Sequence, residues 1–399
     1  MAWSGVREVM PGTTVTCTPS GTTVSTYWRL EPRDHTDDLL TTIDTVRAMI
    51  AAAVARTPTA AGLLSGGLDS GLLAALNRPT DTFDVDFPGH HHHFSPDSER
   101  ALPDAPFADE LAAHLKTRHH RLSLTPNRLA DPAVRAAVAR AYDLPPGWGD
   151  RDRSAYLLYR AVRSSFASVM SGEGADELFA GYAVFFAREA RQARTFPWIA
   201  TGYDTYAPHP EALNPDLQLD LPVHLANRHT AALPPPHGAS RDERDAHRIG
   251  HLYLTRGLPA LAARVRALGR AADLTVHTPF MTLDLIEYVH SVPWVMKTFD
   301  SREKSLLRAA AADLLPRSVL TRAKSAYPAT RDPNYDGLLL RQARALVGNP
   351  DHSVFAIVHR AWLDILEPAV PMAARTRNTV EWILNLAAWL DLHRPRLKL

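Results

Sequence analysis

Two short apolar segments of this chain run directly into turns that combine glycine with acidic residues. The first reads LLSGGLDSG over residues 63–71, and the second reads SGEGADELFAGY over residues 171–182. A glycine turn that opens a helix presents backbone N–H groups and the positive end of the helix dipole to an anion. The common phosphate loop, GxxxxGK[ST], is absent from the sequence. The first turn therefore predicts a phosphate-binding loop of another type.

The segments around both turns predict an α/β fold with a parallel sheet. Strands are expected at residues 61–64, 82–87 and 167–170, and helices at residues 36–56 (with Thr36 as N-cap), 70–77, 107–115 and 154–166. Alternation of strands with helices is typical of a parallel sheet, whose ligands bind at the carboxyl ends of its strands. Both glycine turns follow such strand ends, so we expect them to lie at the same edge.

The rest of the chain predicts three further regions. TTVTCT and TTVSTYW alternate around Pro19-Ser20-Gly21, which indicates a β-hairpin within the first thirty residues. Residues 190–250 are rich in proline and poor in periodicity, which predicts an extended insertion with short helices. After His251 the pattern is mostly helical, and residues 380–392 (VEWILNLAAWLDL) have the spacing of a core helix.

Composition excludes several classes of function. The 399 residues are 45% hydrophobic and 22% charged, as in ordinary globular proteins, and the formal net charge of +1 argues against a nucleic-acid partner. The single cysteine, Cys17, excludes an intramolecular disulfide and a multi-cysteine metal site. The sequence has neither the apolar core of a signal peptide nor an apolar run long enough to span a bilayer. We therefore expect a cytoplasmic protein without membrane contact.

Acidic residues follow both strands that lead into the glycine turns. Asp69 follows the first strand, and Glu173, Asp176 and Glu177 follow the other. Two carboxylates that converge on a phosphate site can hold Mg²⁺, which prefers oxygen ligands. Acidic residues also cap helices, and for one turn alone capping would be the simpler interpretation. Two such turns in one sheet favour the metal site.

The two motifs, in this order, resemble the synthetase domain of the asparagine synthetase family, which includes β-lactam synthetases and lasso-peptide cyclases. The similarity continues through residues 278–330, from TPFMTLDLIEYVH to TRAKSAYPAT, and covers nearly the whole chain. The segments TFPW (195–198) and VPWVMKTFD (292–300) are similar to actinobacterial asparagine-synthetase-like proteins. The resemblance implies an adenine nucleotide α-hydrolase-like sheet, of the PP-loop ATP pyrophosphatase type, with a helical C-terminal portion.

The resemblance also implies a reaction and a set of site residues. In this family ATP activates a substrate carboxylate as an acyl-adenylate with release of pyrophosphate, and ammonia or an amine then attacks. The positions that match the family's nucleotide site are Ser65, Gly66, Gly67, Leu68, Asp69 and Ser70 of the pyrophosphate loop, Val85, Asp86 and Phe87 near adenine, and Gly172. A core strand end is the alternative interpretation of residues 85–87.

The same matching assigns the metal and the catalytic residues. Asp69 and Asp176 match the Mg²⁺ ligands, and Glu173 stands where the family has a group thought to help deprotonate the attacking nitrogen. Lys304 and Lys324 match two phosphate-directed lysines, the second of which also assists amide formation. A lysine is a compact charge that can follow a moving oxyanion. Taken singly, each lysine would be interpreted as a solvated surface residue.

The start of the chain departs from the family pattern. Residues 5–30 resemble only the tail of the family's glutaminase domain, so we interpret residues 1–35 as a hairpin remnant of that domain and residues 36–399 as the synthetase domain. The family's nucleophile is a mature N-terminal cysteine, whereas Ala2 follows the first methionine here. We expect Cys17 to be a packing residue and no glutamine hydrolysis by these residues. Free ammonia, an amine, a separate glutaminase-like or biosynthetic partner, self-association and a truncated sequence all remain open.

A second departure concerns the acyl substrate. Thr275, His277 and Thr282 stand where asparagine-forming members have Glu, Arg and Asp, which makes asparagine a doubtful product. We expect an ATP-dependent amide-forming ligase of another carboxylate, as in natural-product amide, lactam or macrolactam formation. A non-catalytic nucleotide-binding paralogue is the alternative. A tRNA-modifying or sulfur-transfer enzyme would need relay cysteines and a basic face, which the composition does not supply.

One histidine run suggests a metal site but does not predict one. Residues 89–94 read GHHHHF, and neighbouring side chains on extended backbone point to opposite faces. Four consecutive histidines therefore cannot share one ion, and an exposed loop is the expected structure.

Overall fold

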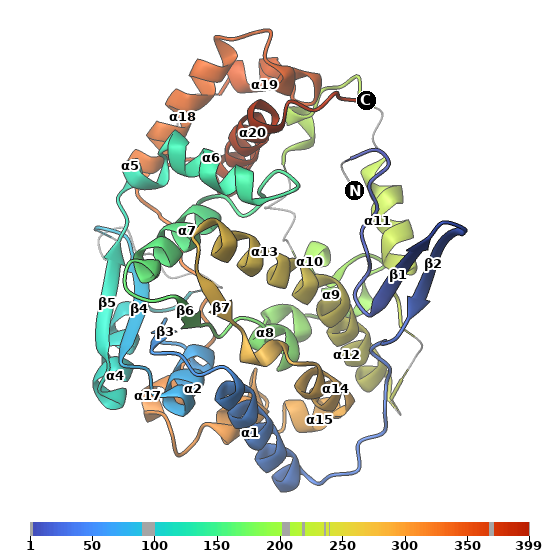
Figure 1. The fold of residues 1–399 in the computed structure, drawn as a ribbon, viewed down its shortest axis with the longest axis vertical. Helices are drawn as coiled ribbons and strands as arrows, with labels where there is room; N and C mark the ends of the chain where they lie inside the picture. Colours follow the sequence, from blue (N-terminus) through green and yellow to red (C-terminus); the bar gives the residue numbers. More distant parts are fainter. Residues whose placement is uncertain are drawn as a thin grey trace.

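The computed structural model describes residues 3–89, 100–201, 208–217, 220–234, 237–238, 240–366 and 371–398. Its centre is a five-stranded parallel sheet with the strand order β5-β4-β3-β6-β7 (Figure 1). The strands are Ala61–Leu63 (β3), Asp81–Asp86 (β4), Arg118–Ser123 (β5), Ser168–Met170 (β6) and Thr275–His277 (β7). The order places β3 and β6, which precede the two glycine turns, side by side. The expected fold class, an α/β fold with a parallel sheet, is confirmed.

Helices cover both faces of this sheet (Figure 1). On one face lie α7 (Asp150–Arg163) and α13 (Leu258–Ala271), and on the other lie α2 (Leu68–Asn77) and α4 (Ala105–Leu115). Each face has its own apolar core. Tyr159 and Val162 belong to the first core, whereas Leu72 and Leu111 belong to the second. Such burial of apolar surface is the main favourable contribution to folding.

The remaining helices extend the two cores. Near the first core lie α5 (Pro126–Leu129), α6 (Pro132–Ala141), α18 (Pro333–Val347), α19 (Arg360–Asp364) and α20 (Ala374–His393). Near the second lie α1 (Leu39–Arg56), α8 (Ala175–Leu178), α14 (Leu283–Ser291), α15 (Trp294–Lys297), α16 (Ser305–Ala310) and α17 (Arg317–Thr321). The expected core helix is present, because Ile383, Leu386 and Leu390 of α20 are buried. None of the helices in the described part of the chain is long and apolar enough to cross a membrane.

Several local expectations are corrected by the structure. Asp38, not Thr36, is the N-cap of α1, because its carboxylate accepts a hydrogen bond of 2.8 Å from the Thr41 N–H. Helix α2 begins at Leu68 rather than Ser70. Strands β5 and β7 were not anticipated. Strand β5 is a sheet edge that reads RHHRLS, with a single apolar side chain, and β7 has only three residues.

The N-terminal hairpin forms as expected but stands away from both cores (Figure 1). Its strands, Thr13–Thr18 (β1) and Gly21–Thr26 (β2), are antiparallel and joined at Pro19-Ser20. Nearly every residue of the ribbon is exposed on both faces. The expectation that Cys17 packs in a core is therefore wrong, because its thiol is exposed.

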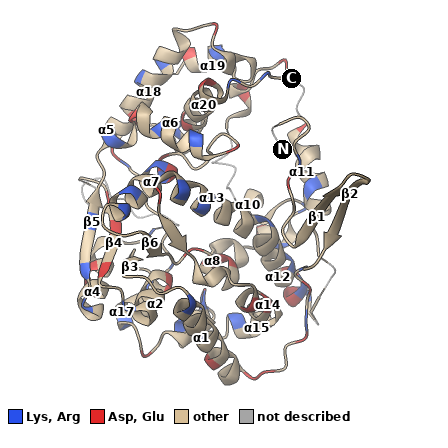
Figure 2. Cartoon of the chain, in the orientation of Figure 1, with Lys and Arg blue, Asp and Glu red and all other residues tan. Residues whose placement is uncertain are grey.

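The proline-rich region contains short helices. These are α9 (Arg188–Gln192), α10 (Pro197–Ala200), α11 (Leu221–Thr230) and α12 (Arg241–Leu252). The last of them begins at the N-cap Ser240, whose hydroxyl accepts a hydrogen bond of 3.1 Å from the Glu243 N–H. Figure 2 shows basic and acidic residues interspersed over helices throughout the described chain.

Candidate active site

A cavity of about 180 Å³ opens at the carboxyl ends of β3, β4 and β6. Both glycine turns and both expected lysines contribute to its wall. Of the sequence-predicted site residues, those that line it are Ser65, Gly67, Leu68, Asp69, Ser70, Val85, Gly172, Glu173, Asp176, Lys304 and Lys324. Segments up to about 260 positions apart in the sequence therefore meet at one edge of the sheet, where parallel α/β sheets bind ligands.

The first turn is held in a form that only glycine adopts readily. Gly66 has φ +76°, and a Cβ there would lie 2.6 Å from the backbone nitrogen of Ala108. The hydroxyl of Ser70 accepts a hydrogen bond of 3.2 Å from the Ser65 N–H, which closes the loop. Because Gly67 is the N-cap of α2, the first N–H groups of that helix lie beside the cavity.

The second turn packs directly against the first. A Cβ at Gly172 would lie 3.0 Å from the backbone nitrogen of Ser70 and 3.2 Å from the Cβ of Asp69. Gly174 has φ +98°, so the chain reverses there into α8. The Ser171 N–H donates to the carbonyl of His277, which anchors the turn to β7. Any larger residue at position 172 would separate the two turns.

Two carboxylates and two ammonium groups meet above these turns. The Nζ of Lys304 lies 2.6 Å from Oδ2 of Asp69 and 2.6 Å from Oδ1 of Asp176. The Nζ of Lys324 lies 2.7 Å from the other oxygen of Asp176. Lys304 is only 3% exposed and has the left-handed φ of +58°. At Gly181, a Cβ would lie 2.0 Å from Oδ1 of Asp176, so the missing side chain leaves room for this carboxylate.

Burial and pairing set the protonation of this cluster. Burial raises the pKa of Asp69, against the effect of Lys304. Burial also opposes the charge of Asp176, but the two lysines prevail and lower its pKa to about 2. The pKa of Lys324 is raised, because Asp176 and Asp69 outweigh the burial of the ammonium group. Asp176 and Lys324 are thus held in their charged forms.

The donor set suits a divalent cation that is shared with a phosphate. Asp69 and Asp176 already enclose a cation, the Lys304 ammonium, which lies 2.6 Å from one oxygen of each carboxylate. Within the described ranges, no group of three or more His, Cys, Asp or Glu residues is arranged to hold a metal ion alone. Mg²⁺ would therefore need phosphate or water oxygens as further ligands, which is its usual coordination with nucleotides.

Glu173 has a cationic neighbour that the sequence did not predict. Its Oε1 lies 4.0 Å from Nη1 of Arg264 on α13, and Arg264 is fixed by an ion pair of 2.8 Å with Asp152. The guanidinium group also lies 5.8 Å from the ring centre of Tyr327, which lines the cavity. Burial raises the pKa of Glu173, with Arg264 opposing it. Arg264 thus places a positive charge beside Glu173 from a helix outside residues 275–282.

Three of the predicted site residues, Gly66, Asp86 and Phe87, are not among the described residues that line the cavity. Phe87 is buried in the first core. The backbone carbonyl of Gly66 accepts a 3.0 Å hydrogen bond from Arg322, which also pairs with Asp104. Arg322 was not among the predicted site residues. It precedes Lys324 in the TRAKSAYP motif, which was the sequence signal that could have indicated its role. Residues 90–94 of the histidine run lie outside the described residues.

Comparison with known proteins identifies the group to which this site belongs. The asparagine synthase family model matches residues 44–391, which is most of the chain. The chain belongs to the asparagine synthase family. The resemblance inferred from the two glycine turns is therefore confirmed, and residues 44–391 form an asparagine synthase domain.

The curated relatives are longer proteins. Asparagine synthetase [glutamine-hydrolyzing] 3 of Bacillus subtilis (strain 168) is 28% identical over 98% of this chain and 67% of its own length. Asparagine synthetase [glutamine-hydrolyzing] 1 of the same organism is 24% identical over 81% of this chain and 55% of its own length. Asparagine synthetase B [glutamine-hydrolyzing] of Escherichia coli (strain K12) is 31% identical over 31% of this chain and 23% of its own length. The chain thus spans about two thirds or less of each.

Proposed function

We propose that this chain is an ATP-dependent amide-forming ligase that adenylates a substrate carboxylate and couples it to ammonia or an amine. The observation that carries the proposal is the meeting of Asp69, Asp176, Lys304 and Lys324 above two touching glycine turns. Membership of the asparagine synthase family supports it. The products proposed are AMP, pyrophosphate and an amide, and the proposed location is the cytoplasm.

The phosphate half of the cavity has the groups that adenylation needs. The departing pyrophosphate gathers negative charge, which N–H groups of residues 65–70 and the two lysines are placed to stabilise. When Mg²⁺ is bound by Asp69 and Asp176, it would neutralise phosphate charge and orient the phosphates. Asp69 and Asp176 would hold this ion, and Lys304 would donate hydrogen bonds to phosphate oxygens beside them. Lys324 would follow the charge that develops during amide formation.

The acyl half of the cavity has a base and a cation. Glu173, whose pKa is raised by burial, is placed to accept a proton from the attacking nitrogen. Arg264, 4.0 Å from Glu173 and buried behind it, would orient this carboxylate. Tyr327 and Val85 offer aromatic and apolar contacts in the same cavity. A carboxylate substrate with an apolar body fits these residues, and natural-product amide or lactam formation is the proposed setting.

The nitrogen donor is proposed to be free ammonia, an amine substrate, or ammonia from a separate glutaminase-like protein. The exposed hairpin of residues 13–26 is the proposed contact for such a partner or for a second copy. Size-exclusion chromatography of the chain with and without a deletion of residues 13–26 tests this contact. A monomer in both forms would remove self-association through the hairpin.

The decisive experiment measures pyrophosphate released from ATP and Mg²⁺ in the presence of a panel of carboxylates. We expect carboxylate-dependent release that is lost in Lys324→Met and retained in Lys398→Met, a matched change at an exposed lysine. Release that does not depend on any carboxylate, or that survives Lys324→Met, contradicts the proposal.

The second candidate is a non-catalytic nucleotide-binding paralogue. It is favoured by Thr275, which is exposed on β7 and carries no charge where asparagine-forming members have Glu. Calorimetry separates the two candidates. ATP binding that depends on Asp69, without turnover over a broad panel of carboxylates and amines, favours the paralogue.

A further inference from the structure

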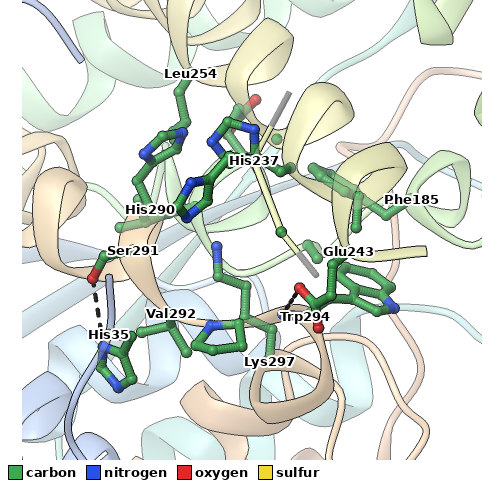
Figure 3. Close-up of a pocket in the computed structure, with 18 of the residues that line it drawn as sticks. His35, Phe185, His237, Glu243, Leu254, His290, Ser291, Val292, Trp294 and Lys297 are labelled. Carbon is green, nitrogen blue, oxygen red and sulfur yellow. Dashed lines mark hydrogen bonds between the residues drawn. The ribbon is translucent and has the colours of Figure 1, made fainter. Parts of the chain in front are cut away.

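A second and larger cavity lies on the other side of α8 from the candidate active site. Its volume is about 450 Å³, and its wall comes mainly from α12, α14 and α15 (Figure 3). Helix α8 separates the two cavities, because Asp176 lines the first and its neighbour Glu177 lines the second. Cavities of this size commonly hold small organic ligands. Nothing in the proposed ligase reaction uses it.

Three histidines of this cavity wall, His237, His247 and His290, form a cluster with His251, which lies beside them. The ring centres of His247 and His290 are 4.8 Å apart, those of His237 and His247 are 5.1 Å apart, and those of His251 and His290 are 5.8 Å apart. Both ring nitrogens of His247 and of His290, and Nδ1 of His251, are buried without a hydrogen-bond partner among the described residues. His290 is only 5% exposed. Buried polar atoms without partners are costly, so such a cluster points to a ligand that supplies them.

One ammonium group, that of Lys297, faces the histidines, and the cavity wall also includes the carboxylates of Asp34, Glu177 and Glu243. Figure 3 shows the Lys297 side chain extending towards the histidine rings. No other described side chain accepts a hydrogen bond from its ammonium group or lies within 4 Å of it as an ion-pair partner. Burial lowers the pKa of Lys297 to about 8, with Glu243 opposing this effect, so most of the lysine is protonated at neutral pH. The Glu243 carboxylate is engaged elsewhere, because it accepts hydrogen bonds of 2.9 and 3.2 Å from the N–H groups of Trp294 and Val295.

The ammonium group beside the histidines favours an anion over a metal ion at that part of the wall. Histidine clusters often bind transition metals, but an ammonium group beside His290 repels a cation. In the described residues, no three groups of metal-binding type are arranged around a common point. The neutral imidazoles offer N–H donors, and Lys297 offers a charge. Phe185, Leu254 and Trp294 add aromatic and apolar walls, which suit the body of an organic molecule.

We propose that this cavity binds a small organic acid, with its carboxylate or phosphate group against Lys297 and the histidines and its body against Trp294. The site is separate from the candidate active site and does not depend on the proposed ligase function. Carboxylate and phosphate share the chemistry that the cavity recognises, which is a compact anion with several acceptor atoms.

Calorimetry on the full chain tests the site with defined probes. Benzoate and phenyl phosphate are the anionic probes, and whichever binds more tightly identifies the preferred acid group. Benzylamine has the same ring with a positive charge and is expected not to bind. Lys297→Met should weaken binding of the anionic probes about tenfold or more, because it removes a charged hydrogen-bond donor. Lys398→Met at the exposed C-terminal end, and Lys324→Met in the candidate active site, should leave that binding unchanged.

A second variant guards against misfolding. If the circular dichroism spectrum of Lys297→Met differs from that of the parent chain, His290→Leu tests the same site. This change removes two ring nitrogens without partners and keeps a side chain of similar volume. The proposal is overturned if neither anionic probe binds at millimolar concentration, or if binding survives both changes. It is also overturned if Zn²⁺ alone binds in a His290-dependent way while the anions do not. Weakening by Lys324→Met alone would place the probes in the first cavity and likewise overturn it.

Discussion

The two cavities on either side of α8 differ in whether their buried charged and polar groups are paired. In the candidate active site, the carboxylates of Asp69 and Asp176 are each within 2.8 Å of a lysine. In the second cavity, both ring nitrogens of His290 lack partners among the described residues, and none of the carboxylates in the wall, those of Asp34, Glu177 and Glu243, forms an ion pair with Lys297. In a site whose carboxylates and lysines are paired, each group can exchange its partner for an opposite charge of a ligand, such as a metal-bound nucleotide. In a site whose hydrogen-bond donors lack partners, binding of a ligand with acceptor atoms is favoured.

The largest expected effect tests the balance of charge in the first cavity. Asp69→Asn removes one carboxylate from the cluster that holds Lys304 and is proposed to hold Mg²⁺. We expect carboxylate-dependent pyrophosphate release to fall about a thousandfold, since an interaction aimed at developing charge is lost. A coupled enzymatic assay for pyrophosphate measures the effect. Asp351→Asn, at an exposed acidic position, is the control and should be within a factor of about two of the parent chain.

A smaller effect is expected at the base, and it should separate the two halves of the reaction. Glu173→Gln preserves shape but removes the group placed to accept a proton, so amide formation should fall about a hundredfold. Pyrophosphate release in the first turnover should persist, because adenylation does not need this base. Quenched-flow measurement of both products makes the comparison. Equal loss of both products would mean that Glu173 acts through the phosphate half instead.

The sequence predicted the first cavity better than the second because the first depends on local patterns. Glycines 66, 67 and 172 lie within a few residues of short apolar strands, and parallel strands bring their carboxyl ends to one edge. The sheet could thus be predicted in class, and most of the predicted site residues do line one cavity. Lys304 and Lys324 came from family resemblance, since an isolated lysine has no local pattern that indicates burial.

The parts that were missed depend on contacts that no local pattern encodes. Arg264 lies on α13, 91 positions from Glu173 in the chain, and only the packing of α13 over the sheet brings the two together. The histidines 237, 247, 251 and 290 have no common spacing, so their gathering follows from how α12 packs against α14. Strand β5 consists mostly of arginine and histidine side chains at a sheet edge, where apolar periodicity is weak.

The geometry of the first turn gives a third test, with an effect of moderate size. Gly66→Ala places a Cβ 2.6 Å from the Ala108 nitrogen and forces alanine into φ +76°. We expect a loss of roughly 2–3 kcal/mol in the free energy of unfolding, and weaker ATP binding, from strain in the loop. Urea unfolding and calorimetry with ATP are the measurements. Gly250→Ala is the matched control, because a Cβ there meets nothing within 4 Å and alanine favours the helix; unfolding free energies that change alike would contradict the strain argument.

The smallest expected effect tests whether His290 in the second cavity lacks a hydrogen-bonding partner in the free protein. Burial, together with like charge on Lys297, His247, His251 and His237, lowers the pKa of His290 to about 2. The unfolded chain therefore binds a proton below about pH 6.5 that the folded chain does not, so stability falls as the pH drops through that value. His290→Leu removes this difference, and its stability relative to the parent should rise by about 2 kcal/mol between about pH 7.5 and pH 5. Urea unfolding at both pH values measures the change, with His224→Leu, at an exposed position, as the control that should show none. If the stability of His290→Leu relative to the parent does not change with pH, His290 has a similar pKa in the folded and unfolded chains. The imidazole would then have a hydrogen-bonding partner in the cavity, which contradicts the difference between the two cavities.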